Sequence, residues 1–256
     1  MKLSNVMKGT RLKVKRANSH IDALIRDTAV LPRDLYEVTN GPHYSNFLLA
    51  KPDSFALAFR PKEPIPEHFG AIMGDAVNNL REALDYWINA AVRCVGPARK
   101  LHFPFVGTGE NLVASRHYVA IEKAFPDAAK FIAKDIDPRR DANLPLWAVT
   151  GLSNDNKHND FLPIVSIATV GVERASSMGV YISDGTFGGD SESPFVMIAS
   201  KSPIAAQKDL KVSAQIAFQK GTVFEYEPVI PTLANMSKVV SQTLDALEKF
   251  IAPYCK

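Results

Sequence analysis

The sequence predicts an α+β protein in which a helical bundle packs with a mostly antiparallel β-sheet. The first observation is a three- and four-residue spacing of apolar side chains in four segments, 6–31, 66–95, 145–156 and 232–251. The second is a strand-like alternation in short stretches of 34–60 and 162–227. The third is size, because 256 residues, 46% of them hydrophobic, bury a core without disulfides or metals. No segment has the composition of a linker, so we expect a single compact domain, helical mainly in 1–31, 66–158 and 232–251.

The first two helices are the longest. The helix over 6–31 presents one apolar stripe and ends at Leu31-Pro32, since proline does not continue a helix. The helix over 66–95 is predicted to be central, because two apolar lines widen its buried face; Pro66 suits its first position and Gly96-Pro97 ends it. The predicted buried residues are Val14, Ala17, Ile21, Leu24, Thr28 and Leu31 in the first helix, and Phe69, Met73, Ala76, Val77, Leu80, Ala83, Leu84, Trp87, Ile88, Ala90, Cys94 and Val95 in the second.

The remaining helices follow at intervals. Residues 98–143 have a weaker pattern, which indicates helices over 111–124 and 126–136. A shorter helix is predicted over 145–156, and the last one over 232–251. The apolar face of the last helix consists of Leu233, Met236, Val240, Leu244, Leu247 and Ile251. Stripes so far apart in the sequence must be buried against one another, which predicts the bundle.

Short extended segments supply the sheet. They are predicted over 35–38, 47–50, 55–59, 163–172, 180–183, 195–199, 210–219 and 222–226. The alternation of aromatic or leucine with alanine in 55–59 predicts a strand with one buried face. Asn40-Gly41 predicts a turn, and Lys220-Gly221 a two-residue hairpin loop between the last two strands. The Gly-, Asp- and Ser-rich stretch 183–193 predicts an exposed loop.

Composition excludes several classes of protein. No apolar run approaches the roughly 18 residues of a membrane span, and no apolar stretch follows the basic N-terminus, so we expect a cytoplasmic protein without a secretory signal. Cys94 and Cys255 have neither a metal nor a redox spacing and are predicted to be free thiols. Residues 1–33 hold eight Lys and Arg against two Asp. Such a helix either meets phosphate or, as we favour, pairs with acidic residues of its own protein.

A polar row on the central helix is the first candidate for chemistry, because the usual nucleotide, metalloprotease and hydrolase motifs are absent. The row, at alternating spacings of three and four, consists of Asp75, Asn78, Glu82, Asp85 and Asn89. Arg81 stands within contact of Asn78 and Asp85. Since an isolated buried charge is costly, the row is either a solvated face with an Arg81–Asp85 ion pair, or a cleft where an amide, a guanidinium and a carboxylate converge.

A second polar stretch, 152–160, follows the apolar patch 146–149. It is typical of a capped helix end, or of a site in which Lys157 binds an anion and His158 transfers protons, since an unperturbed imidazole titrates near neutral pH. Asn154 lies in the same stretch. His20, which flanks the stripe of the first helix, is either a residue at the edge of the core or a third candidate.

The sequence resembles a widespread group of uncharacterised bacterial proteins in a basic first helix with an A-x-x-H-I pattern, here at 17–21, and in three further places. These are 74–86, which the group reads as G-D-x-x-H-N-L-R-x-A-L-D-H, then Phe103-Pro104, then 152–158, which the group reads as L-x-N-x-x-K-H. The R-x-x-x-x-H step of that group is similar to the signature of HEPN domains, all-α bundles that often act as metal-independent ribonucleases. Arg81 matches this step, whereas Tyr86 stands at its histidine position and Asn78 at the earlier histidine of the group. The resemblance implies an arginine and a histidine around a scissile phosphate and its ribose 2′-OH, with His158 or His20 supplying the imidazole.

We therefore predict a HEPN-like protein that binds or cleaves RNA or a nucleotide phosphate, with Arg81 holding the phosphate, Asp85 orienting Arg81 and His158 as the acid or base. The expected binding residues are Asn78, Asn154, Lys157 and His20. A second hypothesis is a non-catalytic interaction or structural protein whose polar row is a buried hydrogen-bond network. A third is a divalent metal held by His20, Asp85 and His158. No cofactor and no membrane partner are expected, and the sequence is compatible with a homodimer.

Overall fold

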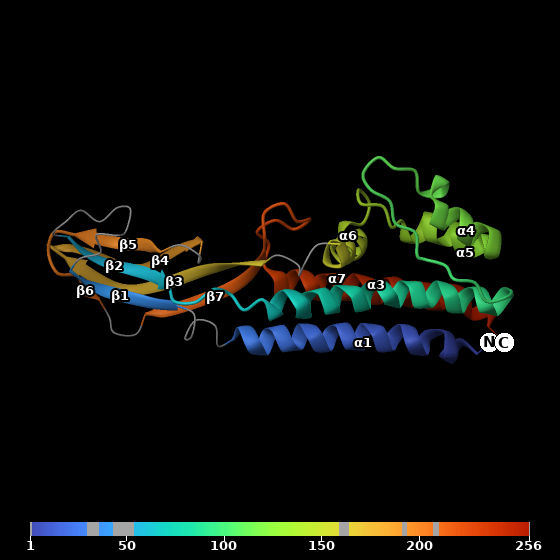
Figure 1. Ribbon diagram of the computed structural model, residues 1–256, viewed down its shortest axis with the longest axis horizontal. Helices are drawn as coiled ribbons and strands as arrows, with labels where there is room; N and C mark the ends of the chain where they lie inside the picture. Colours follow the sequence, from blue (N-terminus) through green and yellow to red (C-terminus); the bar gives the residue numbers. More distant parts are fainter. Residues whose placement is uncertain are drawn as a thin grey trace. The chain divides into compact units, whose positions relative to one another are not determined.

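The computed structural model describes residues 2–29, 36–42, 54–158, 164–190, 194–206 and 210–255 (Figure 1). Its helices and antiparallel strands confirm the predicted α+β class. Contacts group the chain into a helical unit (Met1–Leu24, Gly70–Leu162 and Ile230–Lys256) and a sheet unit (Ile25–Phe69 and Pro163–Val229). The sequence predicts one compact domain. Each unit is assembled from separate stretches of chain, so no linker composition marks the boundary between them.

Three long helices run side by side, α1 (Leu3–Thr28), α3 (His68–Val95) and α7 (Val229–Ile251) (Figure 1). Their predicted stripes are buried, and all six predicted residues of α7 have an exposed fraction of 0%. Burial of one such Leu or Ile contributes about 1.5–3 kcal/mol, so these stripes hold the bundle together. The exceptions are the half-buried Cys94 and Val95, which is 43% exposed, because both lie in the last turn of α3 directly before Gly96. Pro66 lies before the helix rather than in its first turn, where its carbonyl accepts a hydrogen bond from Phe69 N at 3.2 Å.

The basic α1 pairs with acidic residues of its own protein. Arg11 Nη2 lies 2.6 Å from Asp245 Oδ1 and 2.7 Å from Glu248 Oε2, both on α7. Lys13 pairs with Glu82 of α3. These ion pairs support the favoured interpretation of the N-terminal charge, which is that part of it is neutralised within the chain.

Shorter helices complete the helical unit: η1 (Leu112–Ala114), α4 (Arg116–Ala124), α5 (Pro126–Phe131), η2 (Ile132–Ile136) and α6 (Leu144–His158). The helix predicted over 111–124 is interrupted at Ser115, whose backbone is extended and whose Oγ accepts from Tyr118 N at 3.3 Å, which caps α4. The helix predicted over 126–136 begins at Pro126 and becomes a single π-helical turn. Asp137, in the left-handed region at φ 48°, ends it.

The sheet unit holds two antiparallel sheets. In one, β2 (Phe55–Pro61) lies between β1 (Tyr36–Pro42) and β5 (Phe195–Ser200). In the other, β3 (Ile164–Ser177) pairs with β4 (Val180–Asp190), β6 (Ala205–Ala206) and β7 (Lys211–Phe218). The segment predicted at 47–50 lies outside the described residues, as do 30–31 of the first predicted helix.

Four strand predictions are wrong in detail. Asn40-Gly41 makes no turn but lies in β1, opposite Leu57 and Ala56. Residues 183–190 are not a loop, because they continue β4 against β3. Residues 222–226 form turns instead of a strand. The strand at 55–59 has buried residues on both faces, since 56–59 are all buried. Strand pairing and burial in the folded chain, which a local residue pattern does not fix, decide these outcomes.

None of the helices in the described part of the chain combines the length and the apolar character that a membrane crossing requires.

Candidate functional site

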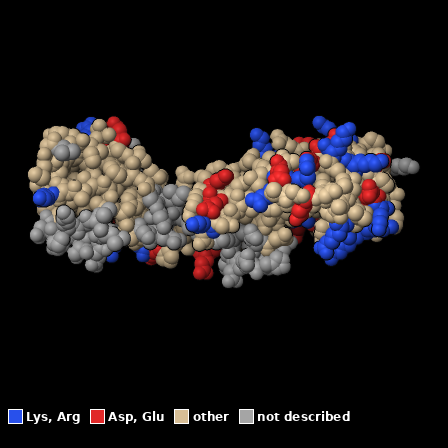
Figure 2. All heavy atoms as spheres, turned by 90° about the horizontal axis from the view of Figure 1, so that it is seen from above, with Lys and Arg blue, Asp and Glu red and all other residues tan. Residues whose placement is uncertain are grey.

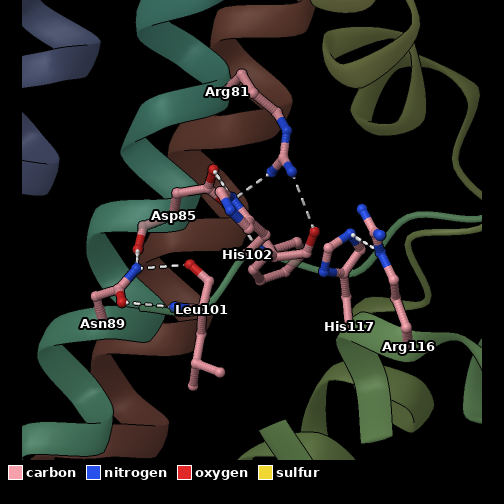
Figure 3. A network of polar contacts seen from close by, with 8 residues as sticks. Arg81, Asp85, Asn89, Leu101, His102, Arg116 and His117 are labelled. Atoms are coloured by element: carbon pink, nitrogen blue, oxygen red, sulfur yellow. Dashed lines mark hydrogen bonds and ion pairs between the residues drawn. The ribbon is translucent and has the colours of Figure 1, made fainter. Parts of the chain in front are cut away.

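A polar network joins the middle of α3 to the extended segment that follows it (Figure 3). Arg81 and Asp85 form the predicted ion pair, with Nη1 and Oδ1 2.9 Å apart. The same Oδ1 accepts from the backbone N of Phe103 at 2.7 Å, and Arg81 Nη2 donates to the Phe103 carbonyl at 3.3 Å. The ion pair therefore holds both backbone groups of Phe103 against the helix.

Asn89, one turn further along α3, holds Leu101 in the same way. Its Nδ2 donates to the Leu101 carbonyl at 2.7 Å, and its Oδ1 accepts from Leu101 N at 2.9 Å. Nδ2 also reaches the backbone carbonyl of Asp85 at 2.6 Å. Leu101 and Phe103 are buried, so their backbone groups need such partners in place of water.

Arg81 is a largely enclosed cation, with its side chain 12% exposed. Burial lowers the pKa of its guanidinium, and the charge and hydrogen bond of Asp85 oppose that effect. The guanidinium carbon also lies 4.7 Å from the ring centroid of Phe105, which is a cation–π contact. Asp85 and the aromatic ring together compensate Arg81 for its lost hydration.

Two imidazoles lie beside this pair (Figure 3). His102 Nδ1 is 3.1 Å from Asp85 Oδ2, and its ring centroid is 5.5 Å from that of His117 in an edge-to-face arrangement. Arg116 Nε donates to His117 Nε2 at 3.3 Å. Burial lowers the pKa of His117, and the charges of Arg116, His102 and Arg81 lower it further against the opposing effect of Asp85. His117 is therefore a neutral imidazole at neutral pH.

These side chains line one pocket of about 450 Å³. Three helices contribute to it: α3 supplies Arg81 and Asp85, α4 supplies Arg116 and His117, and α6 supplies Trp147 and other residues. The remaining lining residues are His102, Phe103, Phe105, Val106, Gly107, Glu110, Thr150, Gly151 and Asn154. The two arginines are matched by two carboxylates, so protonation of a histidine gives the pocket a net positive charge.

A second hollow of about 690 Å³ adjoins the pocket, because Asp85 and His102 line both. Its remaining lining residues are Glu82, Tyr86, Asn89, Arg93, Ala98, Arg99, Lys100 and Leu101. Arg93, Arg99 and Lys100 form no ion pair with any residue that the structure describes. Tyr86 is half exposed there. Figure 2 shows that charged side chains gather over the helical unit, whereas the visible described face of the sheet unit carries few.

The structure brings together some of the predicted site residues. Asn154 lines the pocket with Arg81 and Asp85. Asn78 has another role, since its Oδ1 accepts from the buried Ser153 Oγ at 2.7 Å and ties α3 to α6. His20 is half-buried on α1 and lines neither hollow.

Lys157 and His158 occupy the last turn of α6, and their side chains lie outside the described ones. The roles of an anion-binding Lys157 and an acid or base His158 stay predictions.

Sequence reasoning missed His102, His117 and Arg116. His102 directly precedes the Phe103-Pro104 step, and His117 lies in the first turn after the capping Ser115. The Phe103-Pro104 step and the capping Ser115 are therefore the two local signals that could have drawn attention to these histidines. Neither signal predicts that the two residues meet, because this depends on the path of 96–116 across α3.

No group of three or more His, Cys, Asp or Glu side chains is placed to hold a metal ion within the ranges that the structure describes. The metal hypothesis joins His20 to Asp85 and His158, yet His20 does not line the pocket that contains Asp85. Comparison of the chain with protein-family models, curated proteins and solved structures finds no match. The similarity to HEPN domains therefore stays a prediction from the sequence.

Proposed function

We propose that the pocket around Arg81, His102 and His117 binds an RNA phosphodiester and cleaves it by proton transfer between two imidazoles. The observation that carries this proposal is the meeting of two histidine rings, 5.5 Å apart between centroids, beside an arginine–aspartate ion pair in one open pocket. Such a pair supplies a base and an acid, and the arginines supply cations for the phosphate.

His102 is the proposed base. Its Nδ1–H donates to Asp85 Oδ2, which leaves the lone pair of Nε2 to accept a proton. In the proposed step, Nε2 takes the proton of a ribose 2′-OH, and the 2′-oxygen attacks the phosphorus. The bond from phosphorus to the 5′-oxygen breaks, and a protonated His117 gives its proton to that oxygen. The products are a 2′,3′-cyclic phosphate and a 5′-OH, and the step needs no co-reactant.

His117 is neutral in the free protein, so it can act as an acid only if the bound phosphate raises its pKa. Burial and three neighbouring cationic or ionisable groups lower its pKa. A phosphate bound beside His117 and Arg116 adds negative charge, which favours the imidazolium. Binding of the substrate and charging of the acid are therefore coupled in this proposal.

The adjoining hollow provides a continuation for the chain of the RNA. Arg93, Arg99 and Lys100 offer charges for a second phosphate, and the half-exposed ring of Tyr86 offers a face on which a base stacks. Since Asp85 and His102 line both hollows, an RNA strand bound across them passes the proposed base.

The test is cleavage of a labelled single-stranded RNA by the full chain in the presence of EDTA. His102→Gln and His117→Gln should each lower the cleavage rate by about 100-fold or more, the usual contribution of a general acid or base. His68→Gln, at an exposed histidine that lines neither hollow, is the matched control and should cleave like the original chain. Absence of a cyclic phosphate product, or equal rates in all three variants, would contradict the proposal.

A structural role for the polar row is the second candidate, and one observation favours it. Asp85 and Asn89 bond the backbone of Phe103 and Leu101, which is how a hydrogen-bond network fixes a segment on a helix. In that case the original chain cleaves no RNA and the histidine variants keep their folding, whereas Asn89 variants unfold more easily.

A further inference from the structure

The two cysteines meet in space although 161 positions separate them in the sequence. Cys94 Sγ and Cys255 Sγ lie 3.2 Å apart, within hydrogen-bonding contact. Cys94 is in the last turn of α3, and Cys255 directly follows the short helix η3 (Ala252–Tyr254). Both are half-buried cysteines that form no disulfide. The sequence predicts no redox pair, because residues so far apart in the chain give no local signal that they meet in the fold.

Neighbouring residues place Cys255 independently of the sulfur contact. Tyr254 Oη donates to Asp127 Oδ2 at 3.0 Å, and its ring centroid lies 4.9 Å from that of Phe125 and 5.5 Å from that of Phe250. The tail is therefore held by α5 and α7 while the next residue presents its thiol to α3. A pair arranged in this way encounters each other far more often than two thiols on an unfolded chain.

We propose that Cys94 and Cys255 are a redox-reactive pair that closes a reversible disulfide and fastens residues 252–255 to the end of α3. A low-molecular-weight disulfide such as oxidised glutathione is the oxidant. One protein thiolate attacks a glutathione sulfur, the glutathione S–S bond breaks, and one glutathione thiolate leaves. The second protein thiolate then attacks the mixed disulfide and releases the other glutathione. Two protein thiols thus lose two protons and two electrons, and oxidised glutathione becomes two thiols.

The geometry requires only a small approach of the two sulfurs, since a disulfide bond is about 2.05 Å long. The backbone N of Cys255 donates the last hydrogen bond of η3 to the Ala252 carbonyl at 3.3 Å, so the approach has to come from rotation of the two side chains. Burial raises the pKa of Cys255 to about 11, and its hydrogen bond with Cys94 adds to that effect. The thiolate is the reactive form, so the raised pKa of Cys255 slows its attack on a disulfide at neutral pH and makes closure faster at higher pH.

The test exposes the folded full chain to buffers of reduced and oxidised glutathione. The expected result is loss of both free thiols without added glutathione mass, and one linked peptide pair that contains Cys94 and Cys255. Cys94→Ser and Cys255→Ser should each instead gain a single glutathione. The closed form should melt about 5–10 °C higher than the reduced form, since a disulfide across a long loop restricts the unfolded chain.

Denatured chain in guanidinium is the matched control. There the fraction of the intramolecular disulfide at the same glutathione ratio should fall by about tenfold or more, because contact no longer favours it. The proposal is overturned by separate glutathione adducts on both cysteines of the folded chain, by unreactive thiols, or by equal closure in the folded and the denatured chain.

Discussion

Replacing Asn89 by alanine should destabilise the protein by about 1.5–5.5 kcal/mol. The variant removes the amide that donates to the Leu101 carbonyl and accepts from Leu101 N. Leu101 is 7% exposed, so water does not readily replace these partners. Each buried backbone group that loses its partner costs about 1–3 kcal/mol, and the better helix propensity of alanine returns about 0.5 kcal/mol. The sum is large relative to a typical total stability of about 5–15 kcal/mol.

The assay is urea unfolding of the full chain, with Asn79→Ala as the matched control on the same helix. Asn79 makes one hydrogen bond, from Nδ2 to the Asp75 carbonyl four residues earlier, so its loss should change stability by less than about 0.5 kcal/mol. At about 2–4 °C per kcal/mol, Asn89→Ala should lower the melting temperature by about 3–22 °C. Equal stabilities of the two variants would refute the reasoning that α3 holds the 101–103 segment through Asn89.

Two further predictions concern charge. His117 has a lowered pKa through burial and neighbouring positive charge, so below its ordinary value near 6.5 the unfolded chain binds a proton that the folded chain does not. The free energy of unfolding should therefore fall as the pH drops from 7.5 to 5. In urea unfolding, His117→Gln should show a smaller fall than the original chain. The same pH dependence in both proteins would contradict the burial of a neutral imidazole. Arg11→Ala should lose about 0.2–1 kcal/mol relative to Lys15→Ala, an exposed position on the same helix, because Arg11 pairs with Asp245 and Glu248. Unfolding at 1 M NaCl should narrow this difference, and a difference that grows with salt would count against the ion pairs.

Helices were predictable from the sequence because their determinants are local. The apolar stripes of α3 and α7 repeat over seven turns or so of the chain, and Gly96-Pro97 marks where α3 stops. The Arg81–Asp85 ion pair was predictable for the same reason, since residues four apart on a helix are neighbours. Nothing outside the helix is needed for these inferences.

The strand predicted after Lys220-Gly221 does not form, and neither does the two-residue hairpin predicted at Lys220-Gly221. The segment 222–226 has strand-like residues, yet Phe218 N donates to the Glu227 carbonyl and Tyr226 N to the Phe218 carbonyl, which closes a wider loop. Tyr226 takes a left-handed φ of 63° there, which local strand propensity opposes. The pairing of β7 with the distant β3 fixes this geometry, and a local pattern carries no information about it.

Some residues of the candidate site were likewise predictable from local patterns, and others were not. Arg81, Asp85 and Asn154 were predicted from helical spacing and composition, and they do line one pocket. His102 and His117 were missed, since neither belongs to a periodic pattern. The turn that brings His102 to Asp85 depends on the two backbone hydrogen bonds that Asn89 makes with Leu101. Asn89, a member of the polar row, thus determines where the imidazole of His102 lies.

Asp85 links the structural and the chemical roles of this region. One of its oxygens holds the Arg81 guanidinium and the Phe103 amide, while the other faces His102 Nδ1. A carboxylate engaged in this way fixes the tautomer of the imidazole only when the backbone of 101–103 is already in place. Loss of activity on replacing Asp85 would therefore not distinguish the two roles, because fold and site would be lost together. His102 and His117 supply no backbone hydrogen bond to that segment among the described contacts, so their variants separate chemistry from folding.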